Sequence, residues 1–194
     1  MPARLRDGAT VHLRPLAPGE VDVVEQVFTG MSARSRQQRY LVPMPRLPGG
    51  ARRSLAATDS DRHVAWVALL DGRPVGLCRF VRTAHDRAEV AFEVVDAQQG
   101  RGIASTLVDA VAAVADAVGV RWLEASVAHG NHASVAVLAG LGLELRPDDG
   151  LLVGTGLLRL PAVPRVDRVA VLELAGQLVA GPTSRSTAAA TSSS

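Results

Sequence analysis

Apolar residues recur at helical spacing in two stretches of the chain. Val21, Val24 and Phe28 follow one another at intervals of three and four, which is typical of one face of a helix. A longer series between residues 100 and 118 keeps the same intervals and predicts a second amphipathic helix, which Gly119 should end. This series consists of Ile103, Leu107, Val111, Val114 and Val118.

Shorter apolar runs bounded by turn residues predict strands. Asp71-Gly72 is typical of a β-hairpin turn, and the three prolines and two glycines of Pro43–Gly50 predict a loop. Two further helices are expected, one from the N-cap Ser32 through Leu41 and one over His132–Leu141. The strands are expected at Val11–Leu16, Val64–Leu70, Val75–Arg82, Ala88–Val95, Arg121–Val127, Leu143–Arg146 and Leu151–Leu160.

The expected order is β-α-α-β-β-β-α-β-α-β-β. A strand, a helix and a strand in the middle imply a parallel pair there, with antiparallel strands around it. The predicted fold is therefore α+β, with a mixed, mostly antiparallel sheet whose parallel central pair is flanked by helices. The 194 residues fit one domain, expected over residues 1–160. Residues 161–194 would be a C-terminal extension, with a short amphipathic piece at Val166–Val179 and disorder from about Gly181.

Charge and cysteine content exclude several classes of protein. All 21 basic residues are arginines, and they exceed the 19 acidic residues only slightly. They form no long stripe of the kind that binds nucleic acid, although Arg34, Arg36 and Arg39 cluster locally. The single cysteine, Cys78, excludes an internal disulfide and a multi-cysteine zinc site, and its apolar neighbours predict a core position. Without a signal peptide or a long apolar run, a cytoplasmic protein that does not bind membranes is expected.

Two glycines mark the start of the long helix. The first N–H groups of a helix have no partners within the helix, and the helix dipole places positive charge there. Gly100 and Gly102 would let an anion approach these groups, and Arg101 could add a cation. A tight turn without a ligand is the alternative. The Gly-x-Gly-x-x-Gly pattern fails at Ser105, and the Gly-Lys-Ser/Thr of a P-loop is absent.

The segment around these glycines resembles a known family. Gln99–Ala104 is similar to the Arg/Gln-x-x-Gly-x-Gly/Ala signature of the GNAT N-acetyltransferases, and Ala88–Val94 resembles the family's fourth strand. Asn131 and Leu141–Leu143 resemble its Asn…Leu-Gly-Phe segment. The resemblance covers about Thr10–Leu160 and is closest to bacterial protein-lysine acetyltransferases. It includes weaker matches to the first strand at Leu13–Leu16 and the second helix at Ser32–Arg36.

The resemblance implies acetyl-CoA as cosubstrate and no metal. The backbone at Val94 and Val95 would pair with the pantetheine arm of the coenzyme, and Asn131 would contact it from the next strand end. The pyrophosphate would bind the backbone N–H groups of the turn, which belong to Gln99, Gly100, Arg101, Gly102, Ile103 and Ala104.

Transfer of an acetyl group to an amine requires a base. A lysine-like amine has a pKa of about 10.4 and is mostly protonated at neutral pH, so a nearby carboxylate must take its proton. Glu89 and Glu93 are four residues apart on one strand and face the same side. Both could simply be solvated. The resemblance favours Glu89 as the base and leaves Glu93 as the second candidate.

The family's usual proton donor is missing. Many GNAT enzymes carry a tyrosine in the helix after Asn131, where this chain has Leu138, and its only tyrosine is Tyr40. A thiol has a pKa of about 8.5, so the thiolate is a tolerable leaving group. Water or Ser134 could supply the proton, or no dedicated acid is needed.

Three functions remain open at this stage. The first is an N-acetyltransferase acting on a primary amine of a protein lysine, an amino terminus or a small molecule. The second is an acyl-CoA-binding or sensing domain without turnover, and the third is a nucleotide-binding α/β domain. The expected partners are acetyl-CoA and an amine acceptor, without nucleic acid or membrane, and a homodimer is left open. The loop Pro43–Gly50 is expected to border the acceptor site.

Overall fold

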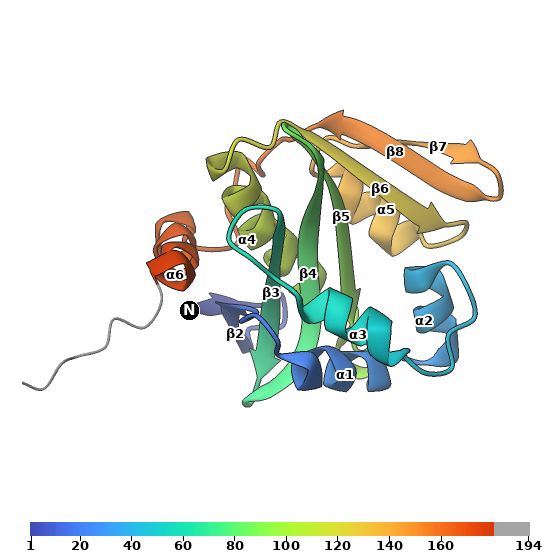
Figure 1. Cartoon of the computed structure of the whole chain (residues 1–194), viewed down its shortest axis with the longest axis horizontal. Coiled ribbons are helices and arrows are strands. Elements are labelled where there is room, and N and C mark those ends of the chain that lie inside the picture. The colour runs from blue at the N-terminus through green and yellow to red at the C-terminus, as the bar shows by residue number, and fades with distance from the viewer. Residues whose placement is uncertain (181–194) are drawn as a thin grey trace, which may run out of the picture.

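One eight-stranded sheet forms the centre of the computed structural model, which describes residues 1–180 (Figure 1). Its strands lie in the order β1-β2-β3-β4-β5-β6-β8-β7. All neighbours are antiparallel except β5 and β6, which are parallel. The predicted mixed sheet with one parallel pair is confirmed. The strands span Pro2–Arg4 (β1), Thr10–Pro15 (β2), His63–Leu70 (β3), Arg73–Ala84 (β4), Arg87–Val94 (β5), Trp122–Ala128 (β6), Glu144–Asp148 (β7) and Leu151–Leu157 (β8).

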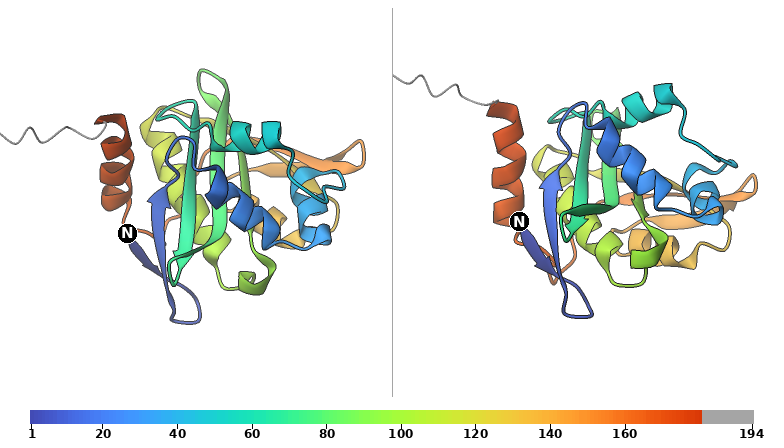
Figure 2. Two further views of the ribbon diagram at one scale, coloured as in Figure 1. Left: turned by 60° about the horizontal axis from the view of Figure 1, so that its bottom comes forward. Right: turned by 90° about the horizontal axis from the view of Figure 1, so that it is seen from below.

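Helices cover both faces of the sheet, as Figure 2 shows from two directions. On one face lie α1 (Val21–Thr29), α2 (Ala33–Tyr40) and α3 (Gly49–Ala56), and on the other lie α4 (Ile103–Ala117) and α5 (His132–Ala139). A short 3-10 helix, η1 (Asp96–Gln98), leads from β5 toward α4, and α6 (Arg168–Ala180) packs beside α4. Among residues 1–180, no helix combines the length and apolarity needed to cross a membrane.

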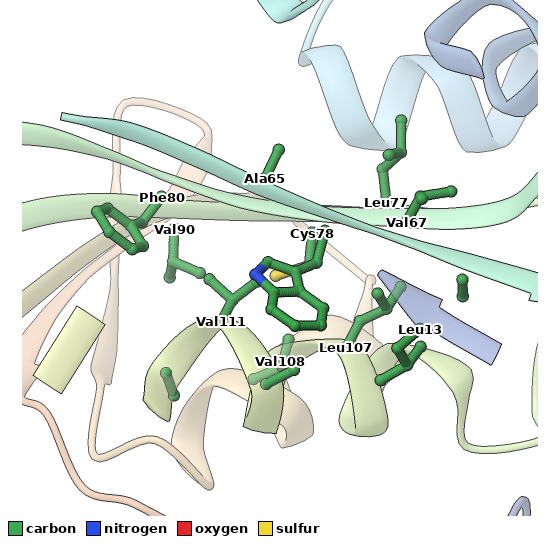
Figure 3. Packing of buried hydrophobic residues seen from close by; sticks show 14 of the residues in the cluster. Leu13, Ala65, Val67, Leu77, Cys78, Phe80, Val90, Leu107, Val108 and Val111 are labelled. Carbon is green, nitrogen blue, oxygen red and sulfur yellow. The ribbon is translucent and has the colours of Figure 1, made fainter. Parts of the chain in front are cut away.

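The core lies on both faces of the sheet, with one layer against α1 and another against α4. The helix α4 is buried along most of its length, and Cys78 is a fully buried free thiol, as predicted. Burial of this apolar surface stabilises the chain and fixes where the N-terminus of α4 lies relative to β5. Figure 3 shows the packing of Leu107, Val108 and Val111 of α4 against Cys78, Phe80 and Val90 of the sheet.

Three elements depart from the expectation. The strand β1 is too short to give a periodic pattern, and it exists because it pairs with β2. Gly49 and Gly50 belong to α3 rather than to the loop. Because this helix buries only Ala56, its sequence shows no clear apolar pattern. The helix α6 covers most of Val166–Val179, but it is not amphipathic, since its apolar residues face both the core and solvent. The disorder expected from Gly181 lies outside the described residues.

The parallel pair opens into a cleft. Strands β5 and β6 pair only over three positions, Arg87 with Trp122, Ala88 with Leu123 and Glu89 with Glu124. Both strands continue beyond Glu89, β5 to Val94 and β6 to Ala128, without pairing to each other. Figure 1 shows the two ribbons diverging. The backbone edge of β5 is therefore free of β6 beyond Glu89, and this gap positions the candidate site.

Candidate active site

A cavity of about 610 Å³ occupies the gap between β5 and β6. Its walls come from these strands, from the N-terminal turn of α4, and from α2 and α5. Of the residues predicted for the site, only Val95 and Arg101 do not line it. Those that do are Glu89, Glu93, Val94, Gln99, Gly100, Gly102, Ile103, Ala104 and Asn131. The loop Pro43–Gly50 contributes no lining residue.

The turn before α4 forms one end of the cavity. Gly100 and Gly102 have φ values of 77° and 97°, in the left-handed region that favours glycine. Gly102 caps the helix, and its carbonyl accepts the first helical bond from the N–H of Thr106. The N–H groups between Gly102 and Thr106 precede the first helical bond and belong to the positive end of the helix. The turn therefore offers the cavity an anion-binding surface.

Gln99 contributes to this turn in another way than expected. Its backbone N–H donates to the carbonyl of Asp96 at 3.2 Å, so it is not available to a pyrophosphate. Its side-chain Nε2 donates to the carbonyl of Val94 at 3.1 Å. Gln99 thus connects the turn to the end of β5 through hydrogen bonds within the protein.

Arg101 also differs from its expected role. Its Nε lies 2.5 Å from Oδ2 of Asp7, and its guanidinium donates to Oε1 of Gln98 as well. These contacts hold the side chain outside the cavity lining. Arg39, which is paired with Glu93, lines the cavity, and two further arginines, Arg6 and Arg165, line it as well. Neither is recognisable from the sequence pattern, because neither lies near the glycine motif.

Strand β5 presents alternate peptide groups to the cavity. The N–H of Val95 donates to the carbonyl of Val75 at 3.0 Å, so this pair is hydrogen-bonded within the β4–β5 ladder. In an antiparallel ladder every second residue directs its polar groups to the partner strand. Because the register is regular from Gly76 to Arg82, it turns the backbone of Phe92 and Val94 away from β4 and toward the cavity. Val94 suits an extended ligand in the gap, whereas Val95 does not.

Glu93 is buried within a network of two arginines. Its carboxylate accepts hydrogen bonds from Nε of Arg39 at 2.5 Å and from Nη2 of Arg79 at 3.1 Å, and only 2% of its side chain is exposed. Burial opposes its ionisation, but Arg39 and Arg79 outweigh that cost and hold the pKa of Glu93 below its usual range. Because Arg79 also donates to the carbonyl of Leu55, the network joins α2 and α3 to the sheet.

Glu89 lies in a different environment on the same strand. Its side chain is exposed and lines the cavity where β5 and β6 begin to diverge. It also lines a second hollow of about 600 Å³, together with Glu124, Ser126 and Glu144. No ion pair engages its carboxylate in the part of the chain that the structure describes. The carboxylate of Glu89 therefore borders both the cavity and the second hollow.

The start of α5 lies across the cavity from β5. Asn131 caps this helix, and its Oδ1 accepts a hydrogen bond from the N–H of Ser134 at 3.2 Å. The amide nitrogen of Asn131 takes no part in this bond and can donate to another group. Leu138 is buried and lines the cavity, while Tyr40 lines it from α2. Burial and the charge of Glu93 raise the pKa of Tyr40 above its usual range, so its phenol stays protonated.

The diverging parallel strands, the glycine-flanked helix start and the cleft between them define the class of protein as a GNAT acetyltransferase. Residues 10–144 match the family described as acetyltransferase (GNAT) domain. The chain belongs to this family, and the resemblance inferred from the motif is confirmed.

Two proteins named Pat or PAT are similar to this chain. Acetyltransferase Pat of Mycolicibacterium smegmatis is 33% identical over 159 residues, which is 79% of this chain and 47% of the relative. The chain thus spans about half the length of this curated relative. The crystal structure of the GNAT domain of S. lividans PAT is 30% identical, with a TM-score of 0.75, and the match covers 81% of this chain and 96% of that one.

A third relative is a longer protein. The cAMP-binding acyltransferase from Mycobacterium smegmatis is 27% identical, with a TM-score of 0.65. The match covers 90% of this chain and 52% of that chain. The shared part therefore corresponds to about half of the longer protein.

Proposed function

We propose that the chain transfers the acetyl group of acetyl-CoA directly to a primary amine, with Glu89 as the general base. One observation carries the proposal: a single cavity is lined by the glycine-flanked start of α4 and by an exposed carboxylate where the strands diverge. Acetyl-CoA could place its pyrophosphate at the first and its thioester at the second. Acetyl-CoA needs both regions, because its pyrophosphate is remote from the thioester that reacts.

The backbone would hold most of the coenzyme. The N–H groups at the start of α4 would receive the pyrophosphate, and Gly100, which has open space where a Cβ would lie, would allow it to approach closely. The peptide groups of Phe92 and Val94 would pair with the amides of the pantetheine arm as an added strand does. The amide nitrogen of Asn131 would contact the arm from the opposite wall. None of these contacts requires a metal.

Glu89 suits the role of base better than Glu93. A base must be reachable by the amine and must be able to accept its proton. Glu93 is buried and held as an anion by two arginines, which makes it a weak base. Glu89 borders both the cavity and the second hollow, so an amine entering from the hollow would meet the thioester beside it. We assign Glu93 a structural role.

The proposed reaction is a direct displacement. Glu89 removes a proton from the ammonium group, directly or through one water. The amine nitrogen then attacks the thioester carbonyl, the carbon–sulfur bond breaks, and the thiolate of coenzyme A leaves. The attacking nitrogen then loses its second proton, which water or Ser134 can pass to the thiolate, a tolerable leaving group. The proton held by Glu89 returns to solvent. The buried Leu138 has no acidic group that could supply this proton.

Calorimetric titration with acetyl-CoA and a thiol-release assay with a panel of amines test the proposal together. Binding with thiol release that depends on an amine supports it. Binding without release from any amine would favour the alternative of an acyl-CoA-sensing domain. Absence of binding at millimolar acetyl-CoA would exclude both the acetyltransferase and the acyl-CoA-sensing domain.

Gly102→Ala tests the anion-binding turn. A residue with a Cβ at this φ value is expected to cost about 1–2 kcal/mol of stability, and the distorted turn should weaken acetyl-CoA binding by about tenfold, or 1.4 kcal/mol. Calorimetry and denaturant unfolding measure the two effects.

Gly119→Ala is the matched control for this change. Gly119 has a φ of 86° at the opposite end of α4, with open space where a Cβ would lie. This variant should lose similar stability and retain coenzyme affinity. Equal affinity losses in the two variants would show that the turn has no special part in binding.

A further inference from the structure

Two arginines at the cavity come from outside the residues that match the family. The match covers residues 10–144, whereas Arg6 precedes it and Arg165 follows it. Both line the cavity that also contains Gly100 and Gly102. Figure 2 shows the N-terminus and α6 at the same side of the sheet. Each of the two flanking segments, residues 1–9 and 161–180, thus contributes one arginine to the cavity lining.

The connection between β1 and β2 holds Arg6 over the turn. The N–H of Arg6 donates to the carbonyl of Arg101 at 3.3 Å, and Arg101 in turn binds Asp7 of the same connection. The side chain of Arg6 lies directly above Gly102: its Cγ is 3.4 Å, and its Nε 3.6 Å, from where a Cβ on that glycine would be. Arg101 therefore fastens the connection, and Arg6 supplies the cation to the cavity.

A buried carboxylate fixes the segment that carries Arg165. Asp109 of α4 is fully buried, and its Oδ2 accepts a hydrogen bond from the backbone N–H of Arg165 at 2.6 Å. Its Oδ1 accepts one from Nη2 of Arg168 at 2.7 Å, and the same Nη2 donates to the carbonyl of Pro161 at 2.8 Å. The segment before α6 is thereby attached to the helix whose N-terminus forms the turn.

The charges of these two side chains are not balanced within the protein. Among residues 1–180, neither Arg6 nor Arg165 forms an ion pair with a carboxylate, unlike Arg101 and Arg168. A guanidinium has five N–H donors and no acceptor. Both side chains are exposed, and Arg6 lies beside the positive end of α4, so both are available to an anion in the cavity. The arrangement suits a phosphate, which arginine binds through paired hydrogen bonds.

We propose that Arg6 and Arg165 form a phosphate clamp, supplied by the two flanking segments, that binds the phosphate groups of the coenzyme. This inference rests on the proposed use of acetyl-CoA and assigns the arginines that determine its affinity. Acetyl-CoA carries phosphate both in its pyrophosphate and at the 3′ position of its ribose. Acetyl-dephospho-CoA lacks only the 3′ phosphate, so the pair of ligands distinguishes the two sources.

Calorimetric titration of the full chain with both ligands tests the clamp. Arg6→Ala and Arg165→Ala should each weaken acetyl-CoA binding by about tenfold, as expected for loss of one charge-assisted contact. If the clamp holds the 3′ phosphate, the same variants bind acetyl-dephospho-CoA as the wild type does. If it holds the pyrophosphate, both ligands lose affinity equally. Either pattern supports the clamp, and unchanged affinity for both ligands overturns it.

Controls separate the clamp from general effects of charge and stability. Arg73→Ala removes an exposed arginine in the β3–β4 hairpin, outside the cavity, and should bind both ligands normally. Arg6→Gln keeps the Cβ, Cγ and Cδ atoms and a polar end without the charge, and it should reproduce the loss if the alanine variant folds poorly. Equal losses in Arg73→Ala would overturn the clamp. Failure of the wild type to bind either ligand would instead refute the proposed function.

Discussion

Glu89→Gln is expected to lower the turnover number by about 10²- to 10⁴-fold, the usual contribution of a positioned base. Acetyl-CoA affinity should not change, because glutamine keeps the shape of the side chain and the coenzyme contacts lie elsewhere in the cavity. Turnover is measured by thiol release with the best amine from the panel, and affinity by calorimetry. The loss should also depend on pH. As pH rises toward the amine pKa of about 10.4, more amine is already neutral, and the deficit should shrink.

Glu124→Gln is the matched control for this prediction. Glu124 lies beside Glu89 on the neighbouring strand and lines only the second hollow. Its replacement removes the same charge and should leave the turnover number within about threefold, a loss below 1 kcal/mol. Equal losses in the two variants would assign the effect to negative charge near the hollow. A Glu89→Gln enzyme with full turnover would remove Glu89 from the role of base.

Glu93→Gln is expected to destabilise the protein by about 3–5 kcal/mol, because it leaves the buried guanidinium of Arg79 and the half-buried one of Arg39 without their anion. Arg39 and Arg79 would lose their shared partner, and α2 and α3 would lose their joint attachment to the sheet. Denaturant unfolding at neutral pH measures the effect. Loss of turnover should follow the loss of folded protein rather than exceed it.

The Glu93 effect has a defined pH dependence. The folded-state pKa of Glu93 is lowered by Arg39 and Arg79, so its contribution to stability is complete above the unfolded value of about 4.3 and is lost as pH falls through the folded value. The wild type should therefore approach the variant in stability under acidic conditions.

Glu144→Gln provides the comparison for Glu93. Its partner Arg146 lies 3.4 Å away, and the two side chains are 79% and 82% exposed. An exposed pair of this kind contributes about 0–1 kcal/mol. Similar stabilities of the two variants would contradict the structural role of Glu93.

Local patterns were sufficient to predict much of the fold and the place of the cavity. The apolar face of α4, the hairpin turn at Asp71-Gly72 and the strand–helix–strand order depend on residues close in sequence. The two glycines before α4 were identifiable for the same reason, since a left-handed turn at a helix start has a local signature.

The roles of individual side chains depended on distant partners. Glu93 and Arg39 are 54 residues apart in sequence, and Arg101 and Asp7 are 94 apart. No periodicity along one strand indicates such contacts, so Glu93 resembled an exposed base and Arg101 an anion ligand. Arg6 and Arg165 were not predictable because their position depends on flanking segments that reach α4 and its N-terminal turn only in the folded chain.

A crystal structure of the chain with acetyl-CoA is the most direct test of the proposed site. The pyrophosphate should lie against the N–H groups at the start of α4, the pantetheine arm should pair with the backbone of Phe92 and Val94, and the thioester should lie beside Glu89. Acetyl-CoA bound outside the gap between β5 and β6, or in the gap with its thioester remote from Glu89, would contradict the proposed mechanism.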